Sequence, residues 1–294
     1  MAGVYWLASY PKSGNTWFRA FLQNLNTNGE RPACINELNT GAIASSRYWL
    51  DSLLGFPTAD LTPGEIENLR PHAYGWLAQG HKIGYPKIHD AYTYTHDGVP
   101  LVSDEGTLGA LYIIRNPLDV APSFASHIDR GIDAAIERMA DPKWALSSQR
   151  RGLLPQVGQR LLTWSQHVLS WVDAPRLNCH VIRYEDMQLD PLNTFSEAAG
   201  FLQLPNDEAR ISKAVRFSDF NELNRQELEG GFKERATSAQ QFFRQGRSGG
   251  WREHLTFEQA QRIINEHGAV MRRFGYLDDL PEEYGPMTAR FFHD

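Results

Sequence analysis

The stretch ASYPKSGNTW, residues 8–17, joins two runs of different periodicity. The apolar run VYWLAS, residues 4–9, is typical of a buried strand, whereas NTWFRAFLQNL, residues 15–25, places apolar side chains at helical spacing. Lys12 and Gly14 lie in the turn between the two runs. Backbone N–H groups at a helix N-terminus attract anions, and a glycine lets the backbone approach a ligand closely. The stretch therefore predicts a strand–turn–helix unit that binds an anion.

The polar residues of this turn support the same prediction. Lys12 adds a positive charge, and Ser13, Asn15 and Thr16 add side-chain donors. The alternative is a structural turn in which Ser13 or Thr16 caps the helix, since hydroxyls are common at that position. The turn does not match a nucleoside triphosphate loop, because G-x-x-x-x-G-K-[ST] requires an upstream glycine and Pro11 precedes Lys12.

A second strand-to-helix junction lies in IIRNPLDVAPSFASH, residues 113–127. The apolar run ends at Arg115, Pro117 suits the first position of a helix, and Ser123 follows about two turns into that helix. A guanidinium and a hydroxyl placed in this way can hold one phosphate. The alternative is a structural ion pair between Arg115 and Asp119.

The rest of the chain alternates between strand-like and helix-like segments. Strands are predicted at 81–89, 110–115 and 179–184, and helices at 62–70, 158–172 and 256–276, with Thr62 and Thr256 as N-caps. This alternation favours an α/β fold in which a central, mainly parallel sheet is flanked by helices on both faces. Ligands bind such sheets beyond the carboxyl ends of the strands. The less regular segments 26–61 and 129–158 are expected to be substrate-facing loops or lids.

Composition narrows the class of protein. The 294 residues, 41% of them hydrophobic, can form one α/β domain or two smaller domains. A net charge of −6 argues against a broadly basic nucleic-acid surface. Cys34 and Cys179 are too few for a disulfide framework or a zinc site. No signal-peptide pattern and no apolar run of about 18 residues is present, so a cytoplasmic protein without a membrane partner is expected.

Five motifs, in this order, resemble the cytosolic-type sulfotransferases that use 3′-phosphoadenosine 5′-phosphosulfate (PAPS). They extend from residue 10 to residue 256, nearly the whole chain: YPKSGNTW (10–17), YPKIHD (85–90), RNPLDVAPSFASH (115–127), VIRYEDM (181–187) and FFRQGRSGGWREHLT (242–256). The resemblance implies one P-loop-like sulfotransferase domain over residues 1–294. It also implies transfer of a sulfuryl group from PAPS to a phenol or alcohol hydroxyl of a small molecule, with release of adenosine 3′,5′-bisphosphate (PAP) and without a metal.

The resemblance assigns a role to each motif. The catalytic base would be His89, and Lys87 and Lys12 would stabilise the charge of the transferred group. The residues implied in donor binding are Lys12, Ser13, Gly14, Asn15, Thr16 and Trp17 in the first turn, Arg115 and Ser123 at the 3′-phosphate, Tyr184, Ser218 and Phe220 beside the adenine, and Arg244, Gln245 and Gly246 in the C-terminal loop.

The chain departs from the family pattern at a few positions. Asn15 replaces the commoner Thr, and Gln245 replaces a Lys, so one contact to the 3′-phosphate is expected either to be weaker or to be supplied by Arg247. Asn15 and the GGW ending are similar to bacterial members. Two other functions stay open at this point. A small-molecule kinase on a P-loop fold would need upstream glycines and a magnesium site, and a nucleotide-binding protein without activity would lack the base at His89.

Overall fold

The computed structural model describes residues 2–148, 153–235, 241–244, 246–278, 280–281 and 284. Its central sheet is parallel throughout and has the order β2-β1-β4-β7, with β3 also paired to β1. The strands are β1 (Gly3–Ser9), β2 (Ile83–Gly84), β3 (Lys87–Ile88), β4 (Thr107–Ile114) and β7 (Cys179–Arg183). A separate antiparallel pair joins β5 (Ala145–Leu146) to β6 (Gln159–Arg160). The predicted fold class is confirmed.

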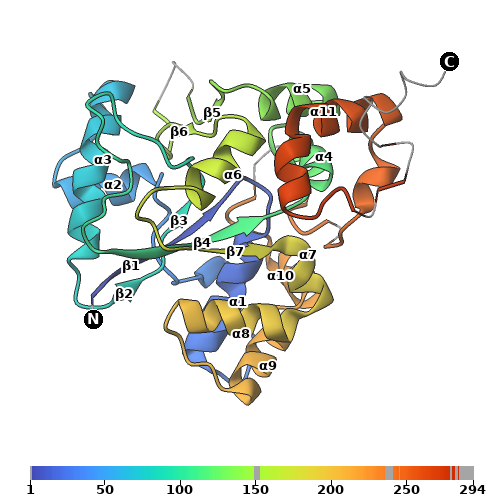
Figure 1. Cartoon of the computed structure of the whole chain (residues 1–294). Coiled ribbons are helices and arrows are strands. Elements are labelled where there is room, and N and C mark those ends of the chain that lie inside the picture. The colour runs from blue at the N-terminus through green and yellow to red at the C-terminus, as the bar shows by residue number, and fades with distance from the viewer. Residues whose placement is uncertain are drawn as a thin grey trace.

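Helices cover both faces of the sheet (Figure 1). α1, α8 and α9 pack on one face, and α3, α4, α6 and α11 pack on the other. The helices are α1 (Asn15–Thr27), α2 (Arg47–Leu54), α3 (Pro63–Ala78), α4 (Pro117–His127), α5 (Ile132–Met139), α6 (Trp164–Val172), α7 (Tyr184–Leu189), α8 (Pro191–Phe201), α9 (Glu208–Phe217), α10 (Phe220–Gly230) and α11 (Phe257–Arg273), with 3₁₀ turns η1 (Ile35–Glu37) and η2 (Gly250–Glu253). Within the ranges given above, none of these helices has the length and apolar character that crossing a bilayer requires.

Strand β1 explains why both faces must be covered. Successive side chains of a strand point to opposite faces of the sheet. Trp6 and Ala8 lie in the apolar cluster beneath α3, α4 and α6, whereas Tyr5 and Leu7 lie in the cluster beneath α1 and α8. All of these side chains are buried, so β1 forms the centre of the fold and delivers the turn after Ser9 to one edge of the sheet.

Two predicted boundaries are wrong. The segment 81–89 forms two short strands rather than one, since Pro86 has no N–H to donate to a sheet; its carbonyl accepts a hydrogen bond from Leu7 N at 2.9 Å. The helix predicted at 158–172 begins only at Trp164, because Thr163 and Gln166 form a capping box there. The capping boxes at Thr62 and Thr256 are confirmed.

Candidate active site

A cavity of about 430 Å³ opens at the carboxyl ends of the parallel strands. Lys12 follows β1, His89 follows β3, Arg115 follows β4 and Tyr184 follows β7, and all four side chains line this cavity. Its volume lies in the range of small-molecule sites. The cavity brings together most of the predicted site residues: Lys12, Gly14, Asn15, Thr16, Trp17, Lys87, His89, Arg115, Ser123, Tyr184, Phe220, Arg244 and Gly246.

The first turn has the geometry of an anion cradle. Gly14 is the N-cap of α1, and the helix has no side-chain cap, so the N–H groups of its first turn are left for a ligand. The alternative in which Ser13 or Thr16 caps the helix is therefore wrong. Gly14 has φ 101°, and an added Cβ would lie 2.6 Å from Cδ2 of Tyr184. Only glycine fits at this position.

Two polar side chains of the turn lie on its inner side. The Nδ2 group of Asn15 donates to the Leu7 carbonyl at 2.9 Å and to Ser9 Oγ at 3.3 Å, so this amide ties α1 to β1. The hydroxyl of Ser13 is buried and has no hydrogen-bond partner. Because a buried polar atom without a partner is costly, Ser13 Oγ is a group that a bound ligand can satisfy.

Lys12 in this turn has three cationic neighbours. Burial lowers the pKa of Lys12 to about 7, and the charges of Arg244, Arg115 and Lys87 add to this effect. Burial and Arg115 also lower the pKa of Arg244. Cations that depress one another in this way provide a site for a multiply charged anion.

Arg115 is held by backbone oxygens rather than by a carboxylate. Its guanidinium donates to the carbonyls of Lys12 at 3.1 Å and Arg247 at 3.3 Å, and its Nε is buried without a partner. Asp119, the alternative partner, instead accepts hydrogen bonds from the N–H groups of Gly249 at 2.7 Å and Trp251 at 2.9 Å. The charge of Arg115 therefore remains available to a ligand, and Asp119 fastens the C-terminal loop to α4.

Aromatic side chains form the wall next to these cations. Trp17 and Tyr184 meet edge to face, with ring centroids 5.5 Å apart, and Arg115 lies 4.2 Å above the Tyr184 ring. Lys12 Nζ lies 3.7 Å from the centroid of Phe242. Flat aromatic surfaces beside cations suit a nucleobase that carries phosphates.

His89 has the tautomer of a general base. Its Nδ1 lies 2.8 Å from the carbonyl oxygen of Ser9, which can only accept, so Nδ1 carries the proton and Nε2 keeps its lone pair. Burial, with the charge of Lys87, lowers the pKa of His89 well below 6.5, which keeps the ring neutral. His167 donates from Nε2 to the His89 carbonyl at 3.0 Å and accepts from the hydroxyl of Tyr112 at 2.8 Å, and thereby fixes the backbone of His89.

The comparison of the sequence with known protein families agrees with this geometry. The family model of the sulfotransferase domain matches residues 4–275. The chain belongs to the sulfotransferase family. Among curated relatives it is 23% identical to sulfotransferase 1C2 of Oryctolagus cuniculus, across 87% of this chain and 79% of that protein. It is 22% identical to flavonol 3-sulfotransferase of Flaveria bidentis, across 87% and 78% of the two chains.

Solved structures show the same fold. Mouse sulfotransferase SULT7A1 in complex with PAP matches with a TM-score of 0.57 and 19% identity, across 92% of this chain and 85% of that one. Retinol dehydratase in complex with retinol and PAP matches with a TM-score of 0.60 and 18% identity, across 92% and 81%.

Of the predicted residues that the structure describes, Ser13, Ser218 and Arg247 are not among those that line the cavity of this sulfotransferase. Ser218 is fully buried, and its hydroxyl donates to the carbonyls of Ala214 and Val215 in its own helix. The guanidinium of Arg247, the suggested substitute for a lysine, pairs with Glu253. Gln245 lies outside the described residues.

The cavity of the sulfotransferase also contains side chains that sequence reasoning missed. His127 lines it, and its pKa is lowered to about 4 by burial and by the charges of Lys12 and Lys87. Its position four residues after Ser123 in α4 places both on one helix face, which is a signal that could have revealed it. Glu234, Gln156 and Gln159 also line the cavity and come from segments without a motif. Among the described residues, no cluster of three or more His, Cys, Asp or Glu side chains is placed to hold a metal ion.

Proposed function

We propose that this enzyme transfers a sulfuryl group from PAPS to a hydroxyl of a small-molecule acceptor and releases PAP. The observation that carries the proposal is the convergence of Lys12, Arg115 and Arg244 on the open N-terminus of α1. PAPS has a 5′-phosphosulfate and a separate 3′-phosphate, so it needs two anion sites supplied by the protein. The PAP complexes of two sulfotransferase-fold proteins support the same donor.

The donor would lie across the cavity from the first turn to the C-terminal loop. Lys12, the buried hydroxyl of Ser13, the backbone from Gly14 to Thr16 and the side chain of Thr16 would bind the 5′-phosphosulfate. Asn15 would contribute its backbone N–H, because its side-chain amide bonds to β1.

The 3′-phosphate would lie beside Arg115. Ser123 and Arg244 line the same cavity, and Arg244 donates to the carbonyl of Pro122 at 3.3 Å, next to Ser123. Gly246 has φ 57° and an added Cβ would lie 2.1 Å from the Phe220 ring, so the C-terminal loop can pack on Phe220 only through a glycine. The adenine would lie among Trp17, Tyr184 and Phe220.

His89 would act as the general base. Sulfuryl transfer is an in-line displacement, so the enzyme must place donor and acceptor, stabilise developing charge and remove the acceptor proton. The Nε2 lone pair of His89 can take that proton, because the Ser9 carbonyl holds the other ring nitrogen as a donor. Lys12 and Lys87 would stabilise the charge on the sulfuryl group and on the oxygen that leaves.

The acceptor would enter between the two long segments. Ile43 belongs to the segment 26–61 and Leu146 and Gln156 to the segment 129–158, and all three line the cavity. These segments include α2 and α5 and would act as the acceptor-facing loops of one domain over residues 1–294. The unpaired thiols of Cys34 and Cys179 are consistent with a reducing, cytoplasmic location.

Two measurements test this function. Calorimetry with PAP in the presence of EDTA should show binding without added metal, motivated by the protein's own counter-charges, Lys12 and Arg115. A screen of hydroxylated acceptors with labelled PAPS should then show sulfated products. Binding that requires magnesium, or equal binding of ATP–magnesium and PAP, would contradict the proposal.

A further inference from the structure

A carboxylate from outside the motifs lies between two cations at the base of the cavity. Glu234 Oε2 lies 3.0 Å from Lys87 Nζ, and its Oε1 lies 2.6 Å from Arg19 Nη1. The side chains of Arg19, Lys87 and Glu234 are 4%, 12% and 23% exposed, so the three charges form a largely buried chain. Arg19 is fixed in turn by the hydroxyl of Thr40, to which its Nε donates at 3.3 Å.

The backbone around Glu234 is held on the turn at residues 34–37. Asn36 donates to the Gly231 carbonyl at 3.0 Å and accepts from the N–H of Lys233 at 2.8 Å. Phe232 is buried in an apolar cluster with Leu223 and Phe243. Residues 231–233 are therefore held by hydrogen bonds to Asn36 and by the apolar packing of Phe232, so Glu234 has a fixed place in the cavity wall.

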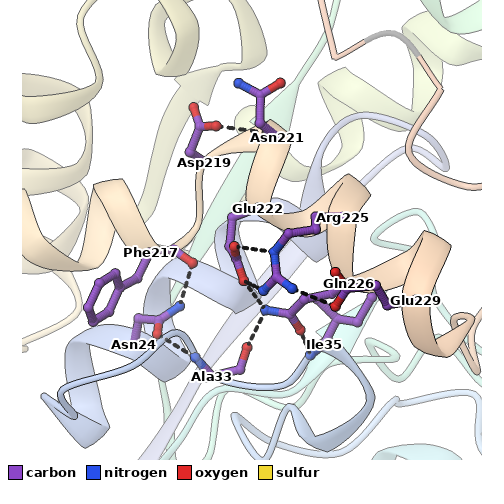
Figure 2. Close-up of polar contacts among 10 residues, drawn as sticks. All are labelled: Asn24, Ala33, Ile35, Phe217, Asp219, Asn221, Glu222, Arg225, Gln226 and Glu229. Carbon is purple, nitrogen blue, oxygen red and sulfur yellow. Dashed lines mark hydrogen bonds and ion pairs between the residues drawn. The ribbon is translucent and has the colours of Figure 1, made fainter.

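The turn itself is anchored between α1 and α10 (Figure 2). Gln226 accepts from the N–H of Ile35 at 2.9 Å and donates to the carbonyl of Ala33 at 3.1 Å. Asn24 accepts from the N–H of Ala33 at 2.8 Å. These bonds connect the position of Glu234 to the same helix, α1, whose N-terminus forms the anion cradle.

The charge of Glu234 affects the protonation of Lys87. Among the described residues, the groups that act on it or feel its charge are Arg19 in α1, Lys12 in the first turn, His89 after β3, His127 in α4 and Glu234, which is the carboxylate of this set. Burial lowers the pKa of Lys87, and the charge of Glu234 opposes that fall. Burial disfavours the ionised carboxylate, yet Lys87 and Arg19 lower the pKa of Glu234 to about 2. Glu234 therefore stays ionised and is unsuited to accept a proton.

We propose that Glu234 is a positioning residue for sulfuryl transfer: held by Arg19, it fixes Lys87 at the sulfuryl end of the donor site and keeps this lysine charged. The inference rests on the proposed function, in which Lys87 acts on the sulfuryl group of PAPS. A buried lysine without a neighbouring carboxylate would lose its proton at lower pH. If Glu234 only hindered binding of the donor, its removal would have the opposite effect and would strengthen binding of PAPS.

The test compares PAPS with PAP, which lacks the sulfuryl group. Calorimetry gives the Kd of each nucleotide from about pH 6 to about pH 10, where a perturbed lysine titrates. Lys12 would contribute to the ratio of the two affinities as well, because it also contacts the sulfuryl group, so the pH profile of each variant is compared with the wild-type profile. Burial lowers the pKa of His89 well below 6.5 and that of His127 to about 4, so neither histidine should account for a change on the alkaline side of the profile.

Three variants complete the design. Glu234→Gln removes the charge and keeps the shape, and Glu234→Asp keeps the charge. Glu229→Gln is the matched control, because Glu229 pairs with Arg225 on the exposed side of α10 (Figure 2). In wild type, the preference for PAPS over PAP should be lost at high pH as Lys87 loses its proton. In Glu234→Gln, the midpoint of this loss should lie at least about one pH unit lower. At pH values between the wild-type and variant midpoints, sulfuryl transfer by Glu234→Gln should be about tenfold slower. PAP affinity should stay within about threefold of wild type, which shows that the fold is intact.

The outcomes separate the two proposals. Glu234→Asp and Glu229→Gln should keep the wild-type midpoint. An unshifted profile in Glu234→Gln, or tighter PAPS binding over the whole pH range, would overturn the role of Glu234 while leaving the enzyme's function intact. Wild-type protein that binds neither nucleotide would contradict the proposed function itself.

Discussion

A ring nitrogen of His89 lies 2.8 Å from the Ser9 carbonyl, and this contact decides which nitrogen can receive a proton. The burial that lowers the pKa of the ring keeps it neutral in the empty site, and it favours release of the proton that the ring takes up in each turnover. A bound anionic donor opposes this effect, because negative charge nearby raises the pKa of an imidazole. At the residue scale, the proposed base is thus neutral in the empty site, and we expect it to become stronger when PAPS is bound.

We therefore predict that His89→Ala keeps PAP affinity within about threefold of wild type but lowers transfer by a factor of about 10²–10⁴. The neutral form is the active one and the pKa of the empty enzyme is lowered, so kcat/KM for PAPS should not fall between about pH 8 and pH 6.5. Isothermal calorimetry and a labelled-sulfate assay measure the two effects. Near-normal turnover of an alcohol by His89→Ala would show that another group takes the proton.

At the scale of elements, the connection from β1 to α1 was predictable because its signals are local. An apolar run, a turn with Lys12 and Gly14 and a helical period are all visible within one short stretch. The inward direction of the Asn15 amide was not predictable, since it depends on the Leu7 carbonyl and on Ser9 Oγ in the packed structure. Glycine at position 14 is required by Tyr184, a residue that is far away along the chain and follows the edge strand β7.

Gly14→Ala tests that requirement. The substitution puts a methyl group in contact with the Tyr184 ring in a backbone conformation with φ 101°, so we predict a loss of stability of about 1–3 kcal/mol and weaker PAP binding. Gly75→Ala in α3 is the control, because an added Cβ there meets nothing within 4 Å; it should stabilise the protein by about 0.5–1 kcal/mol. Urea unfolding and calorimetry provide both values. Similar behaviour of the two variants would contradict the crowding at Gly14.

At the scale of the whole molecule, the sequence predicted the fold class and most of the cavity, because the motifs follow the ends of successive strands. It did not reveal Glu234, whose partners Arg19 and Lys87 lie far away along the chain. It also placed Ser218 beside the adenine, whereas the turn at the end of α9 buries that hydroxyl against its own helix. Contacts that only tertiary packing creates leave no local sequence pattern from which they could be predicted.

The assembled cavity should take up a proton when it binds a nucleotide. In the empty site the pKa of Lys12 is lowered to about 7, so at about pH 8 most Lys12 side chains are neutral. The phosphates of PAP raise this pKa, and Lys12 then gains a proton. Calorimetry in two buffers of different ionisation enthalpy should show net uptake approaching about one proton per PAP at this pH. Lys12→Met should abolish the uptake; equal enthalpies in both buffers for the wild type would contradict it.

Arg19 and Glu234 are 215 positions apart in the chain, yet their side chains pair at 2.6 Å, and Glu234 lines the cavity. During synthesis on the ribosome, the cradle at the start of α1 emerges long before its closing segment. A nascent chain therefore exposes Lys12, Lys87 and Arg115 without the carboxylate and aromatic rings that later enclose them. A chain that ended before residue 230 would therefore lack Glu234, Phe242 and Arg244 of the cavity wall, and we expect it to bind PAP more weakly than the full chain does.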